Sequence, residues 1–182
     1  MKIIETFLKD LLIIEPTIFK DQRGYFFESY SKIKFKDSGI EIDFVQDNQS
    51  FSRYGTLRGL HYQNPPFAQT KLVRVLEGEI IDVVVDLRKK SLTYGKVFTI
   101  LLSEENKKQL LVPQGFAHGF SVISETASVM YKCDQFYNKE SEGGIKFNDP
   151  SLHIDWRIDL KDAIISEKDQ SLPFIESCNS LF

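Results

Sequence analysis

Short runs of apolar, β-branched and aromatic residues recur along the chain, and turn-forming residues separate them. Runs this short and this evenly spaced are typical of antiparallel strands. Glu77-Gly78, between two of the runs, indicates a hairpin turn. The pattern predicts a mostly β fold, built as a double-sheet jelly roll or barrel. The clearest strand candidates are residues 72–76, 80–87, 97–102, 109–112, 119–123 and 127–132.

Helical periodicity is weak throughout the sequence. The best candidates for short helices are residues 29–35, from Ser29, and residues 160–166, ending at Ser166. The polar run from Gln46 to Ser50 predicts a loop. Because no internal repeat, low-complexity segment or linker interrupts the chain, we expect residues 1–182 to form one domain, which is long enough to bury a core.

Composition refines this picture without changing it. Hydrophobic residues make up 42% of the chain and aromatic residues 13%, so we expect an aromatic-rich interior. A net charge of −3 gives no reason to expect nucleic acid or a membrane as a partner. Two isolated cysteines, Cys133 and Cys178, favour a reducing compartment over a disulfide. Lys9-Asp10 interrupts the N-terminal segment before a signal peptide can form, and no stretch approaches the ~18 apolar residues of a membrane span. We therefore expect a soluble, cytoplasmic protein.

Two histidines lie in related motifs, one from Arg58 to Gln63 and the other from Pro113 to Phe120. The second, Pro-x-Gly-x-x-His, resembles the second conserved motif of the cupin barrels, and the first resembles a degenerate version of their first motif. Metal-binding cupins carry His-x-His and then a glutamate in that first motif. Here Gln63 replaces the second histidine, and Lys71 follows downstream. Because an ammonium group repels a divalent cation, we expect no metal, and a pocket that holds an anion or a developing negative charge.

Taken singly, most of the polar residues also have an ordinary structural interpretation. His61 alone is equally well a structural histidine, and His118 a former metal ligand kept as a hydrogen-bond donor. Tyr131 and Tyr137 alone are core or rim aromatics, and His153 is expected on the surface. Pairing of His61 with Asp169 would change its interpretation, because a carboxylate fixes the imidazole tautomer and makes the other nitrogen more basic.

Taken together, the motifs occur in a recognisable order: residues 58–63, 71–75, 78–80, 82–88, 113–120, 131–132 and 155–156. On these motifs the chain resembles the dTDP-4-dehydrorhamnose 3,5-epimerases from about Ile13 to Pro173. The resemblance implies a cupin-type double-stranded β-helix (jelly roll) with a few short helices, and no metal or cofactor. It also implies a homodimer that acts on a dTDP-sugar in the synthesis of dTDP-L-rhamnose, for cell-surface polysaccharide such as lipopolysaccharide.

The implied reaction is epimerisation of dTDP-4-dehydro-6-deoxy-D-glucose at carbons 3 and 5, and its chemistry suits the residues. A ketone makes the protons on its neighbouring carbons acidic, so the enzyme needs a base, a group that stabilises the enolate oxygen, and an acid. His61, oriented by Asp169, fits the base. Lys71, helped by His118, fits the oxyanion partner. Tyr131 fits the acid, because a phenol with a pKa near ~10 keeps its proton at neutral pH.

The same resemblance implies the substrate contacts. Arg23, Arg58 and Lys168 would neutralise the diphosphate, for which a guanidinium fork is well suited. Gln46 and Asn48 would hydrogen-bond the nucleotide or sugar, and Tyr137 would stack on thymine. Some contacts would come from the N-terminal third of a second subunit by strand exchange. Two further residues match binding positions of the family, namely Glu28 and Glu142.

Three other hypotheses remain open at this stage. An epimerase that inverts one centre of another 4-keto nucleotide sugar would use the same base, cation and acid. A metal-dependent cupin is disfavoured by Gln63 and Lys71. A non-catalytic sugar-nucleotide binding module is disfavoured because the acid and base positions are both occupied.

Overall fold

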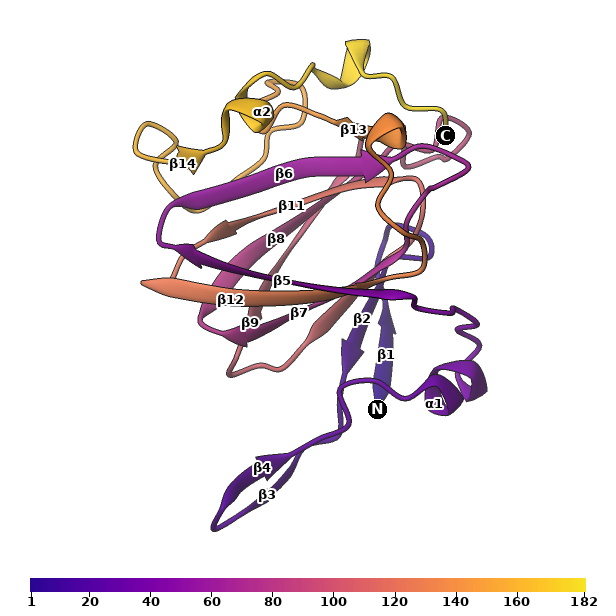
Figure 1. The fold of residues 1–182 in the computed structure, drawn as a ribbon, viewed down its shortest axis with the longest axis vertical. Helices are drawn as coiled ribbons and strands as arrows, with labels where there is room; N and C mark the ends of the chain where they lie inside the picture. The colour runs from indigo at the N-terminus through magenta and orange to yellow at the C-terminus, as the bar shows by residue number, and fades with distance from the viewer.

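Two β-sheets pack face to face in the computed structural model, which describes residues 1–182 (Figure 1). This arrangement confirms the predicted mostly β jelly roll. The first sheet has the order β1 (Lys2–Glu5), β2 (Leu12–Glu15), β10 (Gln109–Val112), β7 (Lys71–Glu77), β12 (Thr126–Cys133) and β5 (Gln46–Arg53). The second has the order β13 (Glu142–Gly144), β6 (Thr56–Gln63), β11 (Phe116–Val122), β8 (Glu79–Asp86) and β9 (Val97–Ser103), and β14 (Ile164–Ile165) pairs with β6. The remaining elements are the hairpin of β3 (Phe19–Asp21) and β4 (Gly24–Phe26), the helices α1 (Lys32–Asp37) and α2 (Glu167–Gln170), and the 3-10 helices η1 (Lys139–Ser141) and η2 (Ile175–Ser177).

The six predicted strand runs are all strands, but two other predictions are wrong. Residues 46–50 are not a loop; they begin β5, which pairs with β12 along its whole length. Residues 160–166 are not a helix, because Ile164–Ile165 adds a short parallel strand to β6. Helix α2 begins only at Glu167, immediately after the predicted segment. The Ser166 hydroxyl caps this helix by accepting a hydrogen bond from the Asp169 N–H. Helix α1 begins at Lys32, three residues after the predicted start.

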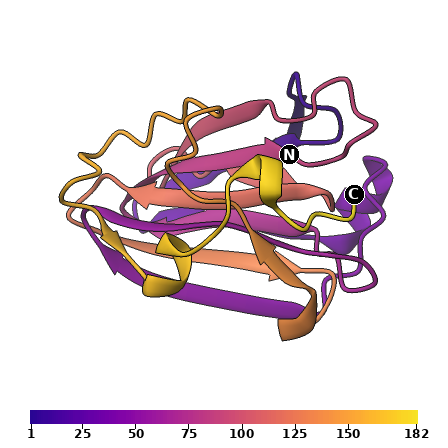
Figure 2. The same ribbon diagram turned by 90° about the horizontal axis from the view of Figure 1, so that it is seen from above.

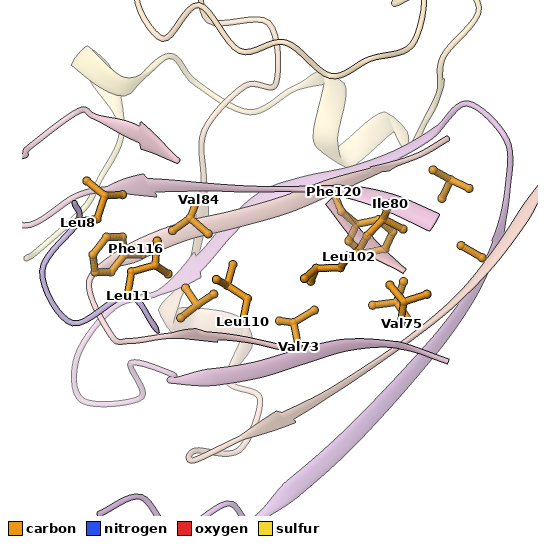
Figure 3. Close-up of a cluster of buried hydrophobic side chains, with 14 residues drawn as sticks. Leu8, Leu11, Val73, Val75, Ile80, Val84, Leu102, Leu110, Phe116 and Phe120 are labelled. Atoms are coloured by element: carbon orange, nitrogen blue, oxygen red, sulfur yellow. The ribbon is translucent and has the colours of Figure 1, made fainter. Parts of the chain in front are cut away.

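Strand alternation decides which side chains enter the space between the sheets. On β7, Val73 and Val75 point inward, whereas Leu72 packs on the outer face. The inward-facing apolar residues form a fourteen-residue core between the sheets, much of which Figure 3 shows. Burial of this apolar area is the main favourable term that holds the sheets together.

The second sheet is covered on its outer face as well. Ile81, Val83 and Val85 of β8 pack against the segment after β13, whose Trp156 is 2% exposed. Buried on both faces, β8 reads as a nearly continuous apolar run in the sequence. On the other sheet, α1 places Phe35 against Leu72 and closes part of the outer face.

The hairpin β3–β4 projects away from the sandwich (Figure 1). Three of its aromatic side chains are exposed: Phe19 at 61%, Tyr25 at 57% and Phe26 at 66%. Elsewhere, Cys133 and Cys178 are free thiols. None of the helices has the length and apolar character needed to cross a membrane.

Candidate active site

Polar residues replace apolar ones at several inward-facing strand positions, and they surround a cavity of about 540 Å³. Strands β5, β6, β7, β11 and β12 contribute to its walls, together with the C-terminal segment that carries β14 and α2. Figures 1 and 2 both show this segment alongside β6. Seven of the predicted site residues line the cavity: Arg58, His61, Lys71, His118, Tyr131, Lys168 and Asp169.

His61 and Asp169 form a hydrogen-bonded dyad across 108 positions of sequence. The His61 Nε2 to Asp169 Oδ1 distance is 2.7 Å, and the Gly59 N–H donates to Oδ2 at 3.0 Å. Burial alone would raise the pKa of Asp169, but the His61 hydrogen bond and the Gly59 amide bring that pKa below its ordinary value. An ionised carboxylate only accepts hydrogen bonds, so Nε2 carries the proton and Nδ1 of His61 is left as the basic nitrogen.

His118 has a dyad partner that the sequence reasoning missed. Its Nε2 lies 2.8 Å from Oδ2 of Asp82, a carboxylate that is fully buried on β8. Because His118 is the register partner of His61 on the neighbouring strand, the two dyads lie side by side. A signal was available: an acid inside the apolar run of residues 80–87 must find a partner when it is buried.

Two glycines allow the strands that carry the histidines to approach closely. A Cβ on Gly119 would lie 2.6 Å from the Arg58 carbonyl oxygen, and one on Gly59 would lie 2.6 Å from the Gly119 Cα. The pairing register of β11 and β6 shifts at this point, between His118 and Phe120. Side chains larger than hydrogen would push the two strands apart here.

Lys71 and Tyr131 supply the cation and the phenol. The Lys71 Nζ lies 5.8 Å from the centroid of the Tyr131 ring. Burial lowers the pKa of Lys71, although Cys133, Asp82 and Glu142 oppose the shift. Burial raises the pKa of Tyr131, so its phenol stays protonated at neutral pH.

A second group of predicted residues lies at the rim. Lys168 forms an ion pair with Glu142, and the Tyr137 hydroxyl donates to the same carboxylate at 3.1 Å. Burial alone would raise the pKa of Glu142, but Lys168, Tyr137 and His61 together bring that pKa below its ordinary value. Gln46 accepts a hydrogen bond from the Tyr137 N–H at 3.4 Å and donates to Asn48 at 3.0 Å. These residues form one connected surface beside the cavity.

Two predicted residues lie apart from this site. Arg23 is on the β3–β4 hairpin, where it pairs with Asp21 and is 86% exposed. Glu28 follows the hairpin and pairs with Lys34. Neither lines the cavity of its own chain.

The cavity offers a paired imidazole, a protonated phenol and an ammonium group around one space. No group of three or more His, Cys, Asp or Glu side chains is arranged to hold a metal ion. This combination suits removal of a proton next to a carbonyl group, stabilisation of the enolate and return of a proton. The fold and the site together define a cupin-type isomerase.

Comparison with known proteins identifies the family. The family model described as dTDP-4-dehydrorhamnose 3,5-epimerase matches residues 5–177. The chain belongs to this family. The enzyme of that name from Methanothermobacter thermautotrophicus is 48% identical over 171 residues, covering 93% of this chain and 92% of the relative.

Solved structures agree with this assignment. The crystal structure of dTDP-4-dehydrorhamnose 3,5-epimerase from Elizabethkingia anophelis is 58% identical, with a TM-score of 0.92 over 97% of each chain. The 3,5-epimerase of Legionella pneumophila, solved in complex with dTDP-4-keto-L-rhamnose, is 46% identical with a TM-score of 0.92, covering 97% of this chain and 93% of that one.

Proposed function

We propose that the chain converts dTDP-4-dehydro-6-deoxy-D-glucose to dTDP-4-dehydro-L-rhamnose by inverting carbons 3 and 5, a step in dTDP-L-rhamnose synthesis. The observation that carries the proposal is that His61, Lys71 and Tyr131 line a single cavity. The bound sugar nucleotide in the Legionella relative supports the substrate class.

In the proposed mechanism, Nδ1 of His61 removes the proton from a carbon next to the ketone. Asp169 stabilises the imidazolium that results, while negative charge moves onto the ketone oxygen. Lys71 stabilises this oxygen as a donor, and His118, whose Nε2 is held by Asp82, would donate from Nδ1 in its imidazolium form. Tyr131 then delivers a proton to the opposite face of the carbon, and solvent restores the original protonation states. Carrying this out on both sides of the ketone inverts two centres with the same groups.

The rim residues suit the nucleotide part of the substrate. Arg58 and Lys168, which line the cavity, would neutralise the diphosphate. The Tyr137 ring, which is 57% exposed, is available to stack on thymine. In the free chain Glu142 pairs with Lys168, so the diphosphate must compete with this carboxylate when it binds.

We also propose that two copies form a homodimer in which Arg23 and Glu28 act on the partner's substrate. Both residues lie outside the cavity of their own chain, on or just after the projecting hairpin. The exposed aromatic residues of that hairpin suit burial against a second copy. The free thiols are consistent with a reducing, cytoplasmic setting.

The test is to incubate the protein with dTDP-4-dehydro-6-deoxy-D-glucose in deuterium oxide and locate the label by NMR. We expect deuterium at both carbons next to the ketone, and loss of this exchange in His61→Asn by about 10²–10⁴ in rate. Label at one carbon only would replace the proposal with a one-centre epimerase. No label would exclude this substrate.

A further inference from the structure

Gln63 occupies the position where metal-binding cupins carry their second histidine, but both ends of its side-chain amide are engaged in hydrogen bonds within the protein. It lies on β6 two residues after His61 and is 5% exposed. Its Nε2 donates to the Phe67 carbonyl at 2.6 Å and to the Phe136 carbonyl at 3.2 Å. Its Oε1 accepts from the Asn138 N–H at 2.9 Å. Both amide hydrogens and one acceptor site are therefore satisfied.

These hydrogen bonds join two loops. One loop follows β6 and contains Phe67, and the other follows β12 and contains residues 134–138. In the second loop, Gln63 holds the backbone on both sides of Tyr137, through Phe136 and Asn138. Other bonds to this loop are made by the Tyr137 N–H to Gln46 at 3.4 Å, by the Ser141 N–H to the Asn138 carbonyl at 3.3 Å, and by Gln69 to the Gln135 carbonyl at 2.8 Å. Only the Gln63 side chain bonds to the residues on both sides of Tyr137 from within the buried interior.

The Tyr137 ring itself has little else to fix its position. More than half of its surface is exposed, and its hydroxyl bonds only to Glu142, which is shared with Lys168. An exposed ring moves with its backbone, so the orientation of this ring depends on the residues before and after it. Gln63 holds both of them from the buried side.

We propose that Gln63 is a positioning residue that presents Tyr137 to the base of the nucleotide, and that it acts through this ring and not through the reacting carbons. The inference rests on the proposed function, in which Tyr137 stacks on thymine. It assigns a role in nucleotide binding to a residue that lies two positions after the proposed catalytic base in sequence. Loss of Gln63 should leave two carbonyl groups and one N–H without their partner and release the loop.

The first experiment compares two probes by calorimetry, dTDP and inorganic pyrophosphate. In Gln63→Ala we expect the Kd for dTDP to rise about tenfold, the size of one base–aromatic stacking contact, while the Kd for pyrophosphate stays unchanged. In turnover, KM for the sugar nucleotide should rise with kcat within about twofold of the wild type. An equal loss of affinity for both probes would overturn the proposal.

A double-mutant cycle with Tyr137→Ala tests whether Gln63 acts through the ring. If it does, Gln63→Ala should weaken dTDP binding in the wild-type background and have almost no effect when Tyr137 is already alanine. Additive effects would contradict the inference. If Tyr137→Ala binds dTDP normally, the stacking proposal fails. If Tyr137→Ala binds weakly but Gln63→Ala binds normally, only the role of Gln63 fails.

Asn64 provides a matched control, because it is the next residue, is also a buried amide at 7% exposure, and also joins segments. It donates to the Asn179 carbonyl and accepts from the Leu181 N–H, so it holds the C-terminal segment and not the Tyr137 loop. Asn64→Ala should lower thermal stability without weakening the binding of dTDP relative to that of pyrophosphate. Should Gln63→Ala fail to fold, Gln63→Met keeps the length of the side chain without its hydrogen bonds. The same selective loss in Asn64→Ala would overturn the proposal.

Discussion

Lys71 is a cation in the cavity wall that has no ion-pair partner of its own in the free chain. The two carboxylates that favour its charged form are engaged elsewhere, Asp82 with His118 and Glu142 with Lys168. Burial consequently dominates and lowers the pKa of the ammonium group. An enolate oxygen in the cavity would provide the missing partner, so the charge is better stabilised during the reaction than before it.

The lowered pKa of Lys71 predicts the alkaline limb of the pH–rate profile. The protonated form of a lysine with a lowered pKa is lost at a lower pH than that of an ordinary lysine, which titrates near ~10.4. As the pH rises, we therefore expect kcat/KM to decrease with a midpoint at a pH lower than this ordinary value, because Lys71 loses its proton there. Tyr131 does not explain this limb, because burial raises its pKa. In Lys71→Arg the limb should move to higher pH at a reduced rate, since guanidinium stays charged. If the alkaline limb stays at the same pH in Lys71→Arg, the loss of activity must come from the titration of another group.

Tyr131→Phe should separate the two halves of the reaction. We expect solvent deuterium to exchange into the substrate at a rate within about tenfold of the wild type, because His61 still removes the proton. Epimerised product should form about 10²–10⁴ times more slowly, because the acid is missing. Tyr62→Phe is the control: it removes a phenol that bonds to Asn179 on the outer face of the sheet, and both rates should persist. Equal damage to both steps in Tyr131→Phe would refute the division of roles.

Between elements, the approach of β6 to β11 is what places the two histidine dyads side by side. Gly119→Ala should force these strands apart, because the new methyl group meets the Arg58 carbonyl. We expect a loss of about 2 kcal/mol or more in the free energy of unfolding, together with a large fall in kcat. Denaturant unfolding and steady-state kinetics measure the two effects.

Gly39→Ala is the control for that substitution. Gly39 lies after α1 with a φ of 81° and nothing within reach of an added Cβ, so only its own backbone is strained. We expect it to lose about 1–2 kcal/mol of stability with an unchanged kcat. Normal kinetics in Gly119→Ala would show that the close approach matters only for stability.

The elements themselves differ in how well the sequence predicts them. The run at residues 80–87 was clear because β8 is apolar on both faces. The sequence predicts a loop for β5 because Gln46, Asn48 and Ser50 occupy its less exposed face, where apolar residues would otherwise mark a strand. Its other face carries Asp47, Gln49 and Arg53 beside a single aromatic residue, Phe51, so no period of two in hydrophobicity remains. The pairing of β14 with β6 depends on a contact more than 100 residues away in sequence, and no local pattern reports it.

At the scale of the molecule, the site draws on both sheets and on the C-terminal segment. The motifs predicted His61, Lys71, Tyr131 and Asp169 as site residues, and these four line one cavity. Local sequence patterns do not predict the relative positions of these side chains, because the pairing and register of distant strands determine them. Asp82 escapes prediction for a different reason: it lies within an apolar run that predicts a core strand, and its partner His118 comes from a neighbouring strand.

The projecting hairpin predicts complementation between two inactive variants. If Arg23 acts on the partner's substrate, a dimer of one Arg23→Ala chain and one His61→Asn chain contains one intact site and one doubly defective site. Random mixing of equal amounts should then restore about a quarter of the wild-type activity. The assay is activity at low substrate after co-refolding.

The matched control for this experiment mixes His61→Asn with Tyr131→Phe. Both of these residues line the same cavity, so neither mixed site is intact and no activity should return. If the mixture of Arg23→Ala and His61→Asn also recovers no activity, Arg23 does not act in the site of the partner subunit.

The carboxylate that orients His61 belongs to α2, whereas the last buried residue of the core between the sheets is Val129. Detachment of α2 from β6 would thus leave that core closed while the imidazole loses its orienting partner. On heating, the loss of turnover should therefore precede global unfolding.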